Sequence, residues 1–139
     1  MSDIVFVDTN ILIYAHDSDA AEKRNRAADA LKKLWSDRTG RLSVQVLQEF
    51  YVTVTKKLPS TLGRAAAREV IRIYTPWVHA PTTPETVIRA TELSELSQLS
   101  FWDGLIIASA EQVGANVILS EDLNAGQIVA GVRIVNPLS

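Results

Sequence analysis

Short apolar runs that alternate with helical patterns are the feature that most limits how this chain can fold. The runs "DIVFVD", "RLSV", "WVHA", "NVILS" and "VRIVN" are brief and rich in branched apolar residues, as strands are. Segments with the period of a helix lie between most of them. Strands separated by helices form parallel sheets that helices cover on both faces. The sequence therefore predicts an α/β fold.

Capping chemistry sets the expected helix boundaries. Ser60, Thr83 and Ser100 are expected to begin helices, because a side-chain oxygen at that position accepts a hydrogen bond from a free backbone N–H. Gly40 is expected to end the helix that contains "AADALKKLWSD". Trp35 lies on the apolar face of that helix, and we expect it in the core.

Length and composition indicate one globular domain over residues 1–139. The chain has 47% hydrophobic and 22% charged residues, which suffices for a core and argues against disorder. The formal net charge of −2 supplies no overall cationic field for nucleic acid, so such binding would need local patches or metal ions. The chain has no Cys, no secretory signal pattern and no apolar run of membrane-spanning length, so a cytoplasmic protein is expected.

Four acidic residues occupy positions where α/β proteins place their ligand sites. Asp8 and Asp122 follow strands, whereas Glu49 and Asp103 lie near the starts of helices. Each has an ordinary structural explanation when taken alone. Asp8 fits a helix cap, Asp122 a turn, Glu49 a solvated helix face, and Asp103 the third position of a capping box that starts at Ser100.

Taken together, the four acids point to a cation. Carboxylates that converge on one edge of a sheet repel each other and protonate unless a metal ion holds them. A site with only oxygen ligands selects Mg²⁺ or Mn²⁺ over zinc. Such ions bind phosphates and activate water, which is the chemistry of phosphodiester hydrolysis.

Four segments carry a family pattern: "VDTNILIYA", "VQVLQEF", "FWDGLIIASA" and "LSEDLNAGQ". In this order they resemble the PIN domain, and within it the VapC-type ribonuclease toxins of prokaryotic toxin–antitoxin pairs. The resemblance runs from Ile4 to Pro137. It implies a central parallel sheet of about five strands flanked by helices, a Mg²⁺- or Mn²⁺-dependent endoribonuclease, a homodimer and a cognate antitoxin protein.

The resemblance also implies roles for individual residues. Metal-holding and catalytic positions correspond to Asp8, Glu49, Asp103 and Asp122, although Glu121 is an alternative to its neighbour Asp122. Small polar positions that orient the acids or bound water correspond to Thr9, Asn10 and Ser120.

Basic and aromatic residues outside these motifs are ambiguous. Arg64, Arg68 and Arg72 recur every fourth residue, which suits RNA phosphates, an acidic partner or a solvated helix face. Lys56 and Lys57 end a helix, where cations are favoured in any case, so the sequence assigns them no function. Trp102 is suited to stacking a base, although packing in the core or a dimer is the more common role.

Two other classes of function compete with the ribonuclease. A non-catalytic RNA-binding or regulatory module would bind RNA without metal and would not cleave it, and intact Asp8, Glu49 and Asp103 argue against this class. A structure-specific DNA nuclease would prefer DNA flaps to RNA.

Overall fold

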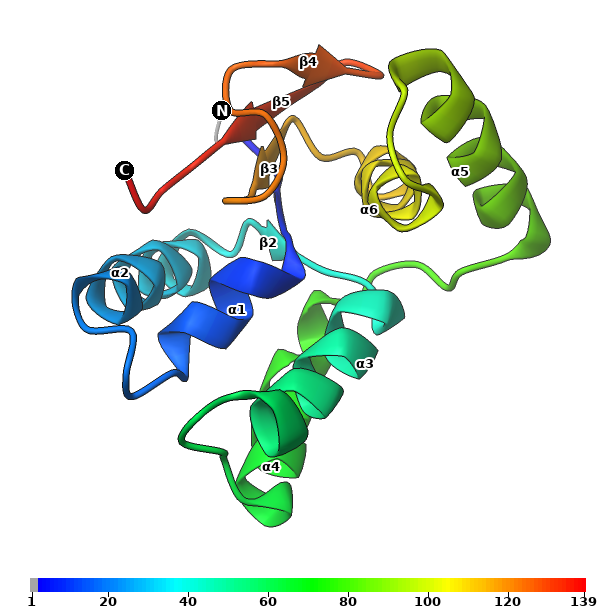
Figure 1. The fold of residues 1–139 in the computed structure, drawn as a ribbon. Coiled ribbons are helices and arrows are strands. Elements are labelled where there is room, and N and C mark those ends of the chain that lie inside the picture. Colours follow the sequence, from blue (N-terminus) through cyan, green and yellow to red (C-terminus); the bar gives the residue numbers. More distant parts are fainter. Residues whose placement is uncertain (1–2) are drawn as a thin grey trace.

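A computed structural model describes residues 3–139 as one mixed sheet with helices packed around it (Figure 1). In chain order the elements are β1 (Val5–Val7), α1 (Thr9–Ala15), α2 (Glu22–Asp37), β2 (Gly40–Arg41), α3 (Val44–Val52), the π-helical turn η1 (Thr53–Lys57), α4 (Arg64–Tyr74), the 3₁₀ turn η2 (Thr75–Trp77), α5 (Pro84–Ser97), α6 (Phe101–Gln112), β3 (Val117–Leu119), β4 (Ile128–Val129) and β5 (Val132–Val135).

The sheet has the strand order β2-β1-β3-β5-β4. The pairs β1–β2, β1–β3 and β3–β5 are parallel, while β4 pairs with β5 in the antiparallel sense. Helices α1 and α2 lie on one side of the strands and α5 and α6 on the other (Figure 1). The predicted α/β fold with a largely parallel, helix-covered sheet is confirmed.

The central strands form the middle of the core. Phe6 and Ile118 are fully buried at neighbouring positions of β1 and β3. Ile134 lies beside Ile118 on β5 and is also buried. Strands this apolar are typical of a sheet with both faces covered. This buried centre fixes where the chain emerges after β1 and β3.

One predicted strand and one predicted helix start are wrong. The segment "WVHA" forms only a single bridge between Val78 and Leu42, because Pro76 and its neighbours adopt the 3₁₀ turn η2 instead. The helix expected to start at Ser60 starts at Arg64, after Gly63 in extended conformation. The fifth strand is instead β4, which is two residues long and lies at the edge of the sheet.

The predictions for Gly40 and Trp35 are also wrong. Helix α2 ends at Asp37 and is capped by Arg38, which adopts the left-handed conformation, and Gly40 belongs to β2. There Gly40 lies against the Trp77 ring, since an added Cβ would come within 2.6 Å of it. Trp35 is 38% exposed and packs at the surface against the rings of Tyr74 and Trp77.

Helices α5 and α6 begin where their caps were expected. The Thr83 hydroxyl accepts a hydrogen bond from the Thr86 backbone N–H at 3.3 Å, and the Ser100 hydroxyl accepts one from the Asp103 N–H at 3.1 Å. The two helices approach closely at Gly104, where an added Cβ would lie 2.6 Å from the Ala90 carbonyl oxygen. The cap and this close contact together fix the start of α6 and the position of Asp103.

Candidate functional site

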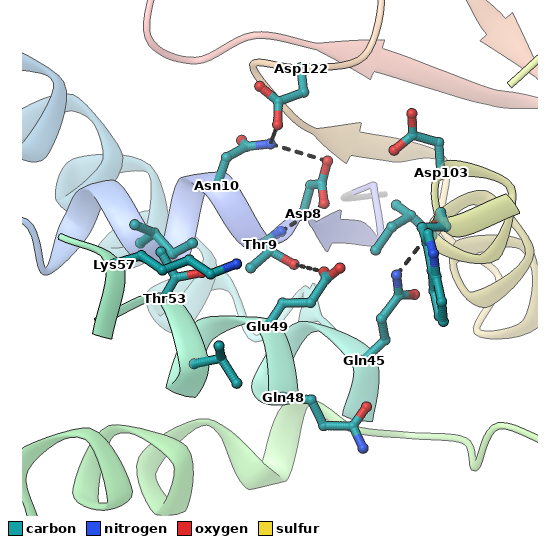
Figure 2. A pocket seen from close by; sticks show the side chains of 14 residues that line it. Asp8, Thr9, Asn10, Gln45, Gln48, Glu49, Thr53, Lys57, Asp103 and Asp122 are labelled. Carbon is teal, nitrogen blue, oxygen red and sulfur yellow. Dashed lines mark hydrogen bonds between the residues drawn. The ribbon is translucent and has the colours of Figure 1, made fainter. Parts of the chain in front are cut away.

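The four predicted acidic residues line one pocket at the carboxyl ends of β1 and β3. The pocket has a volume of about 560 Å³ and is open to solvent (Figure 2). Each acid comes from a different part of the chain: Asp8 follows β1, Glu49 lies on α3, Asp103 begins α6 and Asp122 follows β3. The fold thus brings these four side chains to the walls of one pocket at one edge of the sheet.

Asp8 lies deepest, with only 6% of its surface exposed. It caps α1, and its carboxylate accepts hydrogen bonds from the Thr9 backbone N–H at 2.7 Å and from the Ser120 hydroxyl at 2.8 Å. The pKa of Asp8 is nevertheless raised to about 6, chiefly by burial and also by the nearby charges of Asp122 and Glu49, against the effect of these hydrogen bonds. Asp8 is therefore a carboxylate whose charge the protein only partly compensates.

Glu49 is positioned by the residue that follows Asp8. The Thr9 hydroxyl donates a hydrogen bond to Glu49 Oε1 at 2.6 Å, which ties α3 to the start of α1 (Figure 2). Thr9 thus contacts two of the acids, through its backbone N–H and through its side chain. A role for Thr9 in orienting the acids stays a prediction.

Asn10 links the remaining acid to Asp8. Its Nδ2 group donates to Asp8 Oδ2 and to Asp122 Oδ2, each at 3.2 Å, and its Oδ1 accepts from the Glu121 backbone N–H at 3.0 Å. Ser120 is within 3.5 Å of the same Nδ2 group. Asn10 and Ser120 therefore hold the ends of β1 and β3 together around the carboxylates.

The structure distinguishes Asp122 from its neighbour Glu121. Glu121 turns away from the pocket and forms an ion pair with Lys23, with 2.7 Å between Nζ and Oε2. The Tyr14 hydroxyl donates to Glu121 Oε1 at 2.6 Å. Both contacts lower the pKa of Glu121. Asp122 is the member of the pair that lines the pocket.

Asp103 lies on the opposite side of the pocket from Asn10, the residue that donates a hydrogen bond to Asp122 (Figure 2). The capped first turn of α6 fixes its backbone. Within residues 3–139, no side chain forms an ion pair with its carboxylate. A negatively charged group at this position is favoured by the helix dipole. Asp103 is consequently a carboxylate that is held in place without an ion-pair partner among residues 3–139.

The donor set suits a hard divalent cation. The acidic side chains that line the pocket are four carboxylates, and neither His16 nor His79 lines it. Buried Asp8, with its pKa near 6, would be stabilised as an anion by a bound cation. In the part of the chain that the structure describes, however, no three acidic or His side chains are already gathered closely enough to share an ion. The residues fit the metal by chemistry, and binding it requires the carboxylates to move together.

Several pocket residues were missed in the sequence. Gln45 and Thr53 line the pocket one turn before and one turn after Glu49, and Lys57 follows a turn later. The spacing of four along a helix was a signal for the first two. Lys57, to which the sequence assigned no function, continues this spacing, but its place in the pocket also depends on the π-helical turn η1.

Trp102 also lines the pocket and is 61% exposed, so burial in the core of the monomer is excluded. Its backbone carbonyl accepts a hydrogen bond from Gln45 Nε2 at 3.3 Å, which joins α3 to α6 beside the acids.

The three arginines do not lie in the pocket. Arg64, Arg68 and Arg72 are exposed on α4, and none of them lines the cavity that holds the acids. Arg72 forms an ion pair with Glu69, with 3.3 Å between Nη1 and Oε2. A role for them in binding RNA or a partner stays a prediction.

Comparison with known proteins identifies one family. The PIN domain matches residues 5–129. A search of curated proteins finds no match to the sequence. In the described residues, no helix combines the length and the apolar character needed to cross a membrane.

Three solved structures share the fold. VapBC2 from Rickettsia felis, bound to a DNA fragment from its promoter, has a TM-score of 0.64 at 19% identity, covering 95% of this chain and 97% of that one. VapC20 from Mycobacterium tuberculosis, a toxin that cleaves the sarcin–ricin loop, has a TM-score of 0.62 at 20% identity, covering 85% and 89%. FitAcB from Neisseria gonorrhoeae has a TM-score of 0.63 at 16% identity, covering 96% and 97%.

Proposed function

Because this chain belongs to the PIN domain family, we propose that it is a divalent-metal-dependent endoribonuclease and the toxin of a toxin–antitoxin pair. The observation that carries the proposal is the gathering of Asp8, Glu49, Asp103 and Asp122 in one pocket, with Asp8 buried and its pKa near 6. The family supplies the expectation of nuclease chemistry, and the pocket supplies the acidic groups that such chemistry needs.

The four carboxylates would hold Mg²⁺ or Mn²⁺, and this ion would activate water and stabilise the charge that develops on the leaving oxygen of the phosphodiester. Thr9 keeps Glu49 pointed into the pocket, and Asn10 holds Asp8 beside Asp122. Ser120 hydrogen-bonds the deepest carboxylate and fixes its orientation. These contacts would reduce the reorganisation that substrate and ion binding require.

Similar folds support the choice of RNA and of a protein partner. VapC20 cleaves an RNA loop, and VapBC2 is a complex of toxin and antitoxin. We extend these properties to this chain as part of the proposal, together with a homodimer and a location in the cytoplasm, where the RNA substrate is found.

Cleavage assays with defined nucleic acids test the proposal. Purified protein is incubated with structured RNA, single-stranded RNA and DNA flaps while Mg²⁺ or Mn²⁺ is titrated. We expect RNA cleavage that requires the metal and is lost in Asp8→Asn and in Asp103→Asn, since each removes a charged ligand. Asp29→Asn, an exposed change on α2, is the control and should cleave as wild type does.

Three results would contradict the proposal. Undiminished cleavage by the Asp8→Asn and Asp103→Asn proteins would show that the acids are not the catalytic groups. Cleavage of DNA flaps in preference to RNA would identify a DNA nuclease. Metal-independent RNA binding without cleavage under any condition would identify a binding module.

A further inference from the structure

The pocket contains one basic side chain among the described residues that line it, Lys57. Lys57 is exposed at the end of η1. Despite the four carboxylates in the same pocket, no acid within residues 3–139 lies within ion-pairing distance of its ammonium group. The structure therefore leaves a free cation at the rim of an acidic pocket.

The π-helical turn accounts for the position of Lys57. In a continuous α-helix, a residue eight positions after Glu49 would be rotated about 80° from it around the axis. The wider turn of η1 rotates less per residue, so Lys57 returns toward the side of the helix that carries Glu49 and Thr53. Figure 2 shows Lys57 and Gln45 on opposite sides of Glu49. Such local π turns are often found at functional sites.

The two ends of the pocket differ in chemistry. At one end, Gln45 is joined to the Trp102 backbone and the exposed indole stands beside Asp103. At the other end, Lys57 and the Thr53 side chain provide a cation and a hydroxyl. A strand of RNA presents phosphates along one edge, and a lysine ammonium is a good point charge for one of them. The lysine end of the pocket is thus the end suited to a phosphate.

We propose that Lys57 binds a backbone phosphate adjacent to the one that the acidic residues address, and so positions the RNA strand in the pocket. This inference rests on the proposed ribonuclease function, which supplies RNA as the ligand. Lys57 is a positioning residue here, because the reacting phosphate lies at the carboxylates and not at its ammonium group. The arginines on α4 do not line the pocket and do not serve this purpose.

The neighbouring residue Lys56 provides a matched control. Lys56 is also exposed and belongs to the same turn, but it does not line the pocket. Lys57→Gln and Lys56→Gln therefore change the net charge equally. Lys57→Arg keeps the charge at the same place and should restore binding.

The experiment measures binding of a short fluorescein-labelled single-stranded RNA by anisotropy, in EDTA so that no cleavage occurs. We expect Lys57→Gln to weaken binding several-fold at 50 mM salt, while Lys56→Gln stays close to wild type. Loss of one phosphate contact lowers the salt slope by about 0.7, so the gap should shrink by about threefold between 50 and 200 mM salt. In cleavage assays Lys57→Gln should raise KM with little change in kcat.

Two outcomes would overturn the inference: Lys57→Gln and Lys56→Gln bind RNA equally well at all salt concentrations, or the wild-type protein does not bind RNA. Failure of the proposed function has a different signature. If the wild-type protein binds RNA through Lys57 but never cleaves it, the inference about Lys57 stands and the ribonuclease proposal fails.

Discussion

Asp8 is the most buried of the four acids that line the pocket, and its acidity is strongly perturbed. Its pKa is raised from 3.8 to about 6, chiefly by loss of hydration. Asp8 is harder to ionise in the folded state than in the unfolded state. Its contribution to the free energy of unfolding is therefore fully present at pH values below its unfolded pKa. This contribution is lost as the pH rises through about 6. The difference in pKa of about 2 corresponds to about 3 kcal/mol at neutral pH.

Asp8→Asn is therefore expected to stabilise the metal-free protein at pH 7.5 by about 1 to 3 kcal/mol, because it removes a buried charge. Asparagine also caps a helix well. Part of the gain is offset, since the new amide N–H group would face the Asn10 Nδ2 group that now donates to Asp8. Urea unfolding in EDTA measures the effect.

The same measurement at pH 3.5 provides the internal control, because wild-type Asp8 is protonated there and the advantage of the variant should vanish. Asp29→Asn should change stability little at either pH. If Asp8→Asn is less stable than wild type at pH 7.5, the charge of Asp8 is not a cost to the fold.

The acids were predictable from the sequence for a reason that does not extend to their neighbours. Asp8 and Asp122 follow apolar strands, and parallel strands deliver their carboxyl ends to one edge whatever the details of packing. Which of Asp122 and Glu121 lines the pocket could not be predicted, because Glu121 is held by Lys23 and Tyr14, which are distant from it in sequence. The position of Lys57 in the pocket depends on a π-helical turn that no sequence pattern indicates.

Helices α5 and α6 approach so closely at Gly104 that this element pair sets the position of Asp103. A Cβ at residue 104 would meet the Ala90 carbonyl oxygen at 2.6 Å and the Ser94 side chain at 3.3 Å. Backbone atoms of a packed helix cannot yield as a flexible side chain does. Replacing Gly104 must therefore displace one helix relative to the other.

Gly104→Ala is expected to destabilise the protein by about 1 to 2 kcal/mol, because the cost of overpacking exceeds the gain in helix propensity. It should also weaken Mg²⁺ binding, since α6 carries Asp103 at its start. Thermal unfolding and metal titration measure the two effects. Gly63→Ala is the control: nothing lies within 4 Å of its added Cβ, and stability should stay within about 0.5 kcal/mol. Equal behaviour of the two variants would contradict the close helix contact.

Elements were predictable where local pattern and tertiary environment agree. Strands β1 and β3 are continuous apolar runs, and Thr83 and Ser100 cap their helices as expected. In "WVHA" the apolar residues suit a strand, but Trp77 belongs to the 3₁₀ turn η2, which contains Pro76, and its ring fills the space beside Gly40. Strand β4 exists only because β5 pairs with it, so its two residues carry no periodic signal.

At the scale of the whole molecule, the sheet order joins distant parts of the chain into the pocket. Strands β1 and β3 are neighbours although more than a hundred residues separate them, and the acids of α3 and α6 approach from either side. Four carboxylates in one place oppose folding through their mutual repulsion, and an ion that binds only the folded arrangement opposes that effect. Metal binding and global stability should therefore be coupled.

We expect Mg²⁺ at about one hundred times its Kd to stabilise the protein by about 2.7 kcal/mol, in a single cooperative transition if the chain is one domain. Protons compete with the metal for Asp8, so the stabilisation should be large at pH 7.5 and should decline as the pH falls below about 6. Thermal unfolding with MgCl₂, against NaCl of equal ionic strength, measures it at both pH values. Asp103→Asn should reduce the shift, whereas Asp29→Asn should not. An equal shift with NaCl, or one independent of pH, would mean that Mg²⁺ acts on the general charge of the protein, because only a site built around Asp8 requires its carboxylate to be ionised.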